Sequence, residues 1–135
     1  MKKLALILML AALFSAGACN SKTGKTIKTA PAGNNLSVSL ATKDGVLKHG
    51  NTEFTLSFAD ASGKSVDVGA VALTFHMPQM GTMSEMNDTA TLTTSDAPGV
   101  YRGRANLGTA GEWQVKITYE GSAGRGQASF SLVAQ

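Results

Sequence analysis

Cysteine is almost missing from this chain of 135 residues, because Cys19 is the only one. A single cysteine cannot form an intramolecular disulfide, so a disulfide framework is excluded. Long hydrophobic runs are equally scarce. The longest, Leu4–Phe14, has 11 residues, whereas a transmembrane helix needs about 20. The sequence therefore predicts no membrane-spanning helix.

Excess positive charge is missing from most of the chain. The whole sequence has 12 basic and 9 acidic residues. From Asn34 onward there are seven basic residues against nine acidic ones, a formal charge of −2. Nucleic-acid binding requires a basic face, so the sequence predicts no nucleic-acid partner.

Catalytic motifs are also missing. There is no Ser-His-Asp order on a strand–turn–helix, no nucleophilic cysteine, and no glycine-rich phosphate loop before a helix. The glycine-rich stretches at 108–111 and 124–126 have the composition of hairpin turns. The two histidines provide little acid–base capacity near neutral pH. We predict that the protein is not an enzyme and find no small-molecule substrate evident.

The N-terminus has the pattern of an export signal. Lys2 and Lys3 precede the apolar run, and small residues lead to Cys19, as in secretory signal peptides. Ala-Gly-Ala before Cys19 resembles the lipobox of bacterial lipoproteins, although leucine is commoner where this chain has Ala16. We predict a cleaved signal peptide over residues 1–18 and an acylated Cys19. An ordinary signal peptide with an incidental cysteine is the alternative.

An acylated Cys19 would anchor the protein to a membrane surface without spanning it. We therefore expect a membrane-anchored lipoprotein of the bacterial cell envelope, facing the periplasm. Asn20 stands where an inner-membrane retention signal would have aspartate, which favours the outer membrane over the inner. Residues 19–34 are polar and contain Gly24, Pro31 and Gly33. They are predicted to form the lipidated cysteine and a flexible tether, and residues 35–135 the folded domain.

After residue 35, apolar and polar residues alternate in short runs, the pattern of half-buried strands. The clearest run is residues 112–120, in which Trp113, Val115, Ile117 and Tyr119 share one face. Strands are predicted over residues 36–42, 52–60, 71–77, 90–94, 100–107, 112–120 and 127–133. Seven short strands separated by turn residues predict an all-β, antiparallel, immunoglobulin-like sandwich.

Methionine is concentrated in one stretch. Apart from Met1 and Met9, every methionine lies within the sequence HMPQMGTMSEM, residues 76–86, at every third position from Met77 to Met86. Soft thioethers beside an imidazole are typical of sites for Cu(I) or Ag(I). The other interpretation is that methionines fill gaps in the core, which strand alternation favours for Met77.

The order of these motifs resembles the YtkA-like domain family and the related FixH-like proteins of bacterial envelopes. The resemblance runs from about Leu36 to Val133. It is carried by Gly69, Ala70, Met77, Pro78, Met80, Gly99, Tyr101, Gly111 and Trp113. It implies a small sandwich domain, found alone as a lipoprotein or joined to heavy-metal efflux and copper-handling proteins. Many members carry a histidine where this chain has Thr82; here His76 precedes the motif instead.

Two functions follow from these residues. In the first, the methionine-rich loop binds Cu(I) or Ag(I) in periplasmic metal handling or efflux, with Met80 and Met83 as the first ligands and His76 and Met86 next. In the second, the loop is a protein-interaction surface that docks on an envelope efflux or oxidase-assembly protein, since flexible methionine-rich surfaces bind adaptably.

Overall fold

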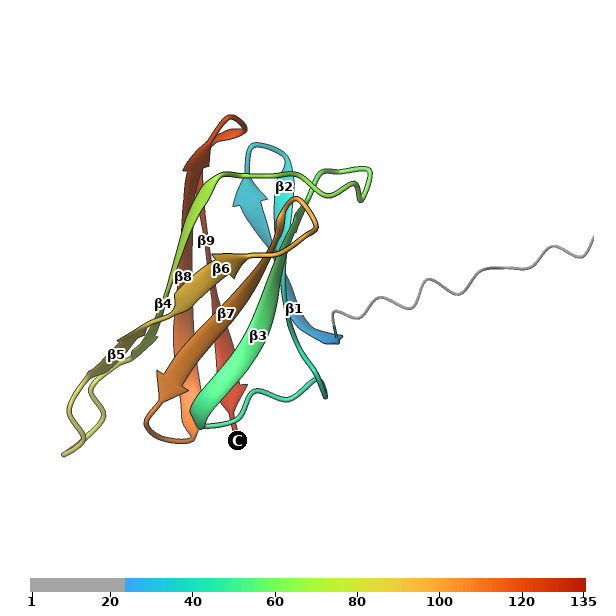
Figure 1. The fold of residues 1–135 in the computed structure, drawn as a ribbon. Helices are drawn as coiled ribbons and strands as arrows, with labels where there is room; N and C mark the ends of the chain where they lie inside the picture. The colour runs from blue at the N-terminus through green and yellow to red at the C-terminus, as the bar shows by residue number, and fades with distance from the viewer. Residues whose placement is uncertain (1–23) are drawn as a thin grey trace, which may run out of the picture.

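Two antiparallel β-sheets pack face to face in the computed structural model, which describes residues 24–135 (Figure 1). The first sheet has the order β1-β2-β3-β7-β6: Lys25–Gly33, Leu36–Thr42, Gly50–Ala59, Val100–Leu107 and Thr91–Thr94. The second has the order β5-β4-β8-β9: Met86–Thr89, Ala70–Met77, Gly111–Gly121 and Gly124–Ala134. The all-β immunoglobulin-like sandwich is confirmed. The signal peptide and the acylated Cys19 fall outside the described residues.

Alternation along the strands builds the core. In β8, Trp113, Val115, Ile117 and Tyr119 are all buried, and the residues between them are exposed. Facing side chains of the other sheet complete one continuous cluster, whose buried members lie between Ala32 and Ala134. Residues 24–135 therefore carry a hydrophobic core of their own, as a domain requires. They contain no helix, and hence none that could cross a membrane.

The predicted count of seven strands was too low, because the structure has nine. One additional strand is β1. The tether predicted over residues 19–34 was wrong from Lys25 onward, since Lys25–Gly33 pairs with β2 along its length. Only two of its residues, Ala30 and Ala32, are buried. An edge strand of small and polar residues lacks the apolar alternation by which strands are predicted, and Pro31 is tolerated there.

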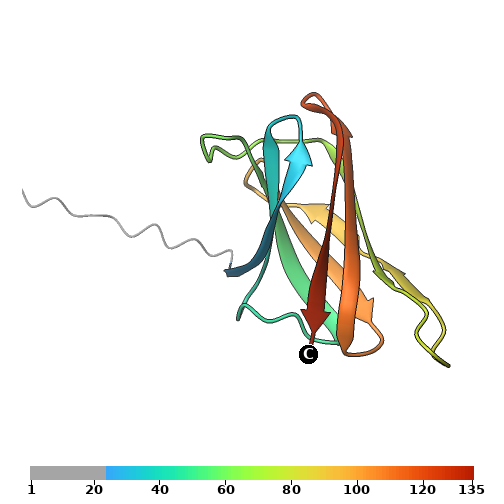
Figure 2. The same ribbon diagram turned by 180° about the vertical axis from the view of Figure 1, so that it is seen from behind.

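Contacts with the second sheet help to fix β1. The hydroxyl of Tyr119 donates to the carbonyl of Ala32 at 2.8 Å, and Asn34 Nδ2 donates to the carbonyl of Arg125 at 3.2 Å. The last part of β1 consequently lies beside β9, as Figure 2 shows from behind. The folded domain thus begins ten residues earlier than its predicted start at residue 35.

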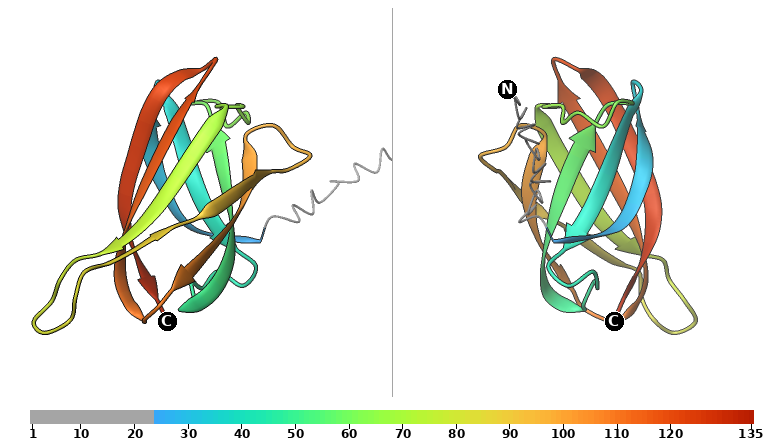
Figure 3. Two further views of the ribbon diagram at one scale, coloured as in Figure 1. Left: turned by 60° about the vertical axis from the view of Figure 1, so that its left-hand side comes forward. Right: turned by 90° about the vertical axis from the view of Figure 1, so that its right-hand side faces the viewer.

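The other additional strand is β5, which pairs with β4. Between β5 and β6 the chain changes sheets at Ala90, a buried residue whose N–H donates to the carbonyl of Leu73 at 2.9 Å. β4 and β5 form a hairpin that extends beyond the body of the sandwich (Figures 1 and 3). This hairpin holds the whole methionine cluster.

Candidate functional site: the β4–β5 hairpin

One register runs the length of the β4–β5 hairpin. Thr74 pairs with Thr89, His76 with Asn87 and Met77 with Met86. Beyond these strands, Met80 pairs with Met83 in an isolated bridge of the same register. The three-residue spacing of the sequence is thereby converted into two cross-strand pairs of methionines, one at the base of the hairpin and one at its tip.

Met80 and Met83 close the tip. The N–H of Met83 donates to the carbonyl of Met80 at 2.9 Å, and the N–H of Met80 donates back at 3.3 Å. Between them, Gly81 has φ +56° while Thr82 keeps a negative φ. This combination is typical of two-residue hairpin turns of type II′, in which glycine takes the first central position. Side chains directly opposite one another in such a ladder have Cβ atoms about 5 Å apart.

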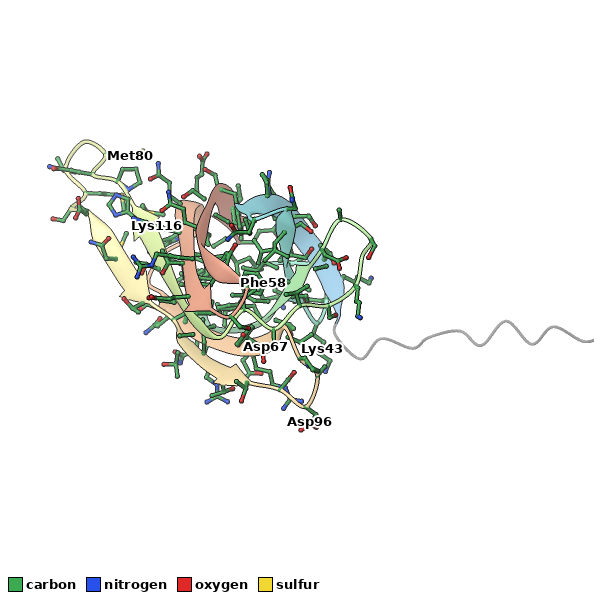
Figure 4. All side chains as sticks on the ribbon, turned by 90° about the horizontal axis from the view of Figure 1, so that it is seen from above. Lys43, Phe58, Asp67, Met80, Asp96 and Lys116 are labelled. Carbon is green, nitrogen blue, oxygen red and sulfur yellow. The ribbon has the colours of Figure 1, made fainter. Side chains whose placement is uncertain are left out.

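The two tip methionines are exposed to solvent. Met80 is 65% exposed and Met83 is 48% exposed, and with Val133 they are the exposed large hydrophobic side chains of residues 24–135. Figure 4 shows Met80 at the outer end of the hairpin. The thioethers therefore do not contribute to the core and are free to contact a ligand.

The two base methionines pack against the body of the domain. Met77 is only 6% exposed. A Cβ atom placed on Gly111 would lie 3.2 Å from Met77 Cε, and one on Gly108 would lie 3.8 Å from Met86 Sδ. Both side chains thus cover the turn between β7 and β8. The prediction that Met77 belongs to the core is confirmed.

His76 takes part in a chain of hydrogen bonds beside the base pair. Its Nδ1 lies 2.7 Å from Asn87 Oδ1, and Asn87 Nδ2 donates to Glu85 Oε1 at 3.1 Å. A carboxylate only accepts hydrogen bonds, so the Asn87 amide must turn its nitrogen toward Glu85 and its oxygen toward His76. Nδ1 of His76 then carries the proton, which leaves a lone pair on Nε2. Histidines that ligate metals are usually held in this way.

The four predicted ligands are not gathered at one point. Met80 and Met83 are adjacent, whereas Met86 lies against the β7–β8 turn. His76 is four residues before Met80, a separation of about 13 Å along an extended strand. Pro78 and Gln79, between them, lie outside the strand ladder, so a bend there is what would bring the imidazole closer.

The donor set of the tip fits a soft ion better than a hard one. Thioether sulfur is a ligand for Cu(I), whereas Zn(II) takes nitrogen, oxygen and thiolate and Ca(II) takes oxygen. Among residues 24–135 no group of three or more His, Cys, Asp or Glu side chains is arranged to hold a metal ion. The metal-ligating side chains at the hairpin tip are the two thioethers of Met80 and Met83.

Asn87 is the residue of this region that sequence reasoning missed. Nothing in the sequence marks an asparagine two residues after Glu85 as part of a site. Only the register of β4 and β5 places Asn87 opposite His76. The predicted strand 71–77 contains His76. The strand that contains Asn87, the four-residue β5, was not predicted.

A model of the YtkA-like family matches residues 31–118, from the last part of β1 to β8. The match includes the entire β4–β5 hairpin. No curated protein matches the chain. The family match confirms the resemblance seen in the Gly69–Met80 and Gly99–Trp113 motifs, and on its extent the chain belongs to the YtkA-like family.

Proposed function

We propose that the β4–β5 hairpin binds a soft monovalent metal ion, Cu(I) or Ag(I), in metal handling or efflux in the bacterial envelope. The observation that carries this proposal is the pairing of two exposed thioethers, Met80 and Met83, at the end of a projecting hairpin. Burying such side chains would stabilise the fold by about 1.5–3 kcal/mol each. Their exposure contributes little to stability, which supports a role for the two side chains in contacting a ligand.

Two sulfur atoms from one hairpin form a small, exposed site from which an ion can be transferred. Thioethers do not oxidise to disulfides outside the cytoplasm as thiols do, so they suit a soft-metal site in the envelope. His76 Nε2 is proposed as a third ligand, which a bend of the chain at Pro78 and Gln79 would bring to the tip. Met86 is assigned to packing against Gly108 and not to the ion.

We also propose that this site lies in the periplasm, close to a membrane. Acylation at Cys19 would hold the domain at the surface of an envelope membrane, the outer membrane being favoured, with the hairpin in the periplasm. No residue is assigned a catalytic role. The ion is a cargo that the protein binds and passes on.

The test is a Cu(I) titration of residues 20–135 against a competing Cu(I) chelator. The variant Met80→Leu/Met83→Leu should lose at least tenfold in affinity, because leucine keeps the apolar volume and removes the sulfur. The matched control is Met77→Leu/Met86→Leu, which removes two thioethers from the base and should change the affinity less than threefold. Wild-type binding no tighter than that of the tip variant would refute the proposal.

A second function is favoured by the same exposure. An apolar tip on a projecting hairpin can dock on another envelope protein, such as an efflux or oxidase-assembly component. The two functions respond differently to substitution. Met80→Leu/Met83→Leu removes metal binding and keeps an apolar docking surface, whereas Met80→Ser/Met83→Ser removes both. Capture of a partner by the leucine variant but not by the serine variant identifies the docking function.

A further inference from the structure

A basic hollow lies on the outer face of the first sheet, whereas the hairpin with its methionine tip belongs to the second sheet. It has a volume of about 740 Å³, and its lining includes Gly24, Lys43, Arg102 and Arg104. Lys43 belongs to the segment between β2 and β3, and both arginines point outward from β7. Seen from above in Figure 4, Lys43 lies near the start of the described chain and Met80 lies on the opposite side of the molecule.

The hollow carries a net positive charge, although the charges of the whole domain balance. Residues 24–135 contain nine basic and nine acidic side chains. The single carboxylate that lines the hollow is Glu53, whose Oε1 accepts hydrogen bonds from Arg104 Nε at 3.1 Å and Nη2 at 2.8 Å. Within the described residues, Lys43 and Arg102 have no ion-pair partner. Two exposed cations therefore face solvent beside threonine hydroxyls of β3 and β6, those of Thr55, Thr91 and Thr93.

The covalent chain places this hollow near the anchor that the proposed function assigns to Cys19. Since β1 begins at Lys25, only five peptide units separate Cys19 from Gly24. Such a segment spans at most about 17 Å in any conformation. Gly24 itself is packed against β2, because a Cβ atom there would clash with the carbonyl oxygen of Thr42. An acylated Cys19 would thus keep the hollow within about two Debye lengths of the membrane surface at physiological salt.

We propose that Lys43, Arg102 and Arg104 form a membrane-docking surface that binds the phosphates of anionic phospholipid headgroups. Arginine pairs with phosphate through a planar fork of N–H donors, and lysine acts as a point charge. Docking on this face directs the hairpin tip away from the membrane, so that Met80 and Met83 face the aqueous compartment. The proposal rests on the anchoring at Cys19, and it adds a defined orientation to that anchor.

The experiment uses residues 20–135 without the acyl chain, so that the surface acts alone. Binding to vesicles of phosphatidylcholine is compared with binding to vesicles that also contain anionic phosphatidylglycerol, by co-sedimentation at low and high salt. We expect binding to the anionic vesicles only, and loss of that binding at high salt because the interaction is screened. Failure of the wild-type protein to bind anionic vesicles at low salt would overturn the proposal.

The variant Lys43→Gln/Arg102→Gln is expected to bind anionic vesicles about 25-fold more weakly, since each basic side chain near an anionic surface contributes about a fivefold factor. The matched control is Lys116→Gln/Arg125→Gln, which removes the same charge from β8 and β9 on the outer face of the other sheet. Equal weakening in the two variants would refute the assignment of this face.

Further measurements separate this proposal from the others. Thermal unfolding of both variants should match that of the wild type, because all four side chains are exposed. Their Cu(I) affinity should be unchanged, so failure of the metal proposal leaves the vesicle result standing. Acylation is checked independently from the mass of the full-length protein extracted from membranes.

Discussion

The base and the tip of the β4–β5 hairpin contain the same residue type in the same pairing, yet their methionines lie in opposite environments. Met77 is 6% exposed at the base, and Met80 is 65% exposed at the tip. The difference arises from the length of the hairpin. Its first pairs cover the β7–β8 turn, whereas its last pair extends past the body of the sandwich (Figure 3). Methionine is thus a packing residue at one end and a candidate ligand at the other.

The largest effect that distinguishes the two ends is expected from Met77→Ala. Removing a buried methionine leaves a cavity and lowers the free energy of unfolding by about 2–5 kcal/mol. Met80→Ala should change it by no more than about 0.5 kcal/mol, as is usual for exposed sites. Urea unfolding measures both values. Similar losses for the two variants would show that the tip also packs against the domain.

Met86→Ala should have an intermediate effect. Met86 is half-buried and packs against the core, so its truncation is expected to lower the free energy of unfolding by about 1–2 kcal/mol, less than full burial would contribute. Met83→Ala is the control, because Met83 lies on the same arm of the hairpin as Met86 but at the exposed tip. If the Met86 and Met83 variants unfold at the same urea concentration, the division between base and tip does not extend to this side of the hairpin.

Gly81→Ala should act on the tip alone. Gly81 has φ +56°, a left-handed conformation that costs other L-residues about 1 kcal/mol or more. The amide hydrogens that pair Met80 with Met83 should then exchange about fivefold faster, while those of β8 keep their rates. Gly81→Asn is the control, because asparagine accepts this conformation more readily. Unchanged exchange in Gly81→Ala would mean that the tip pairing does not depend on the turn.

The smallest effect is expected on the free energy of unfolding at alkaline pH. It involves Tyr101, whose hydroxyl lies near the end of β4 that is opposite to the tip. Burial and the nearby Asp67 carboxylate raise the pKa of Tyr101 above its ordinary value of 10.0, and its hydroxyl donates to the carbonyl of Gly69 at 2.9 Å. The folded state holds this proton more tightly than the unfolded state does. The resulting stability is fully present below pH 10 and is lost as the pH rises through the raised pKa.

Unfolding measured between pH 8 and 11 tests this prediction. The difference in unfolding free energy between the wild type and Tyr101→Phe should be constant up to about pH 10 and should shrink above it. The properties of the tip should not change over the same range, because the Tyr101 hydroxyl bonds to Asp67 and Gly69, just before β4 and at the end of that strand opposite to the tip. A difference that stays constant to pH 11 would contradict the raised pKa.

Much of the fold was predictable because it follows from alternation within single strands. In β8, every second residue from Trp113 to Tyr119 is buried, as the sequence indicates. β1 and β5 were not predictable in this way. Only Ala30 and Ala32 of β1 are buried, and β5 is four residues long. Both owe their conformation to hydrogen bonds with a neighbouring strand rather than to an apolar pattern of their own.

The candidate site was predictable in composition and not in arrangement. Clustering of thioethers identified the stretch, because methionine of that density is unusual for a core. The sequence did not predict which methionines pair, because their spacing of three residues does not match the period of two residues in a strand. The hydrogen bonds that join His76 to Asn87 and Glu85 depend on the same cross-strand register. The basic hollow could not be predicted from the sequence, because Lys43 and Arg102 are far apart along the chain.

By itself, the sequence determined the all-β class, the positions of the strands with strong apolar alternation, and the stretch that contains the candidate ligands. These properties depend on neighbouring residues only. The tertiary structure alone decided which methionines are buried, which pair is exposed, and which cations share a surface. Those outcomes depend on strand pairing between distant segments, where a shift of one residue would exchange the buried and the exposed side chains.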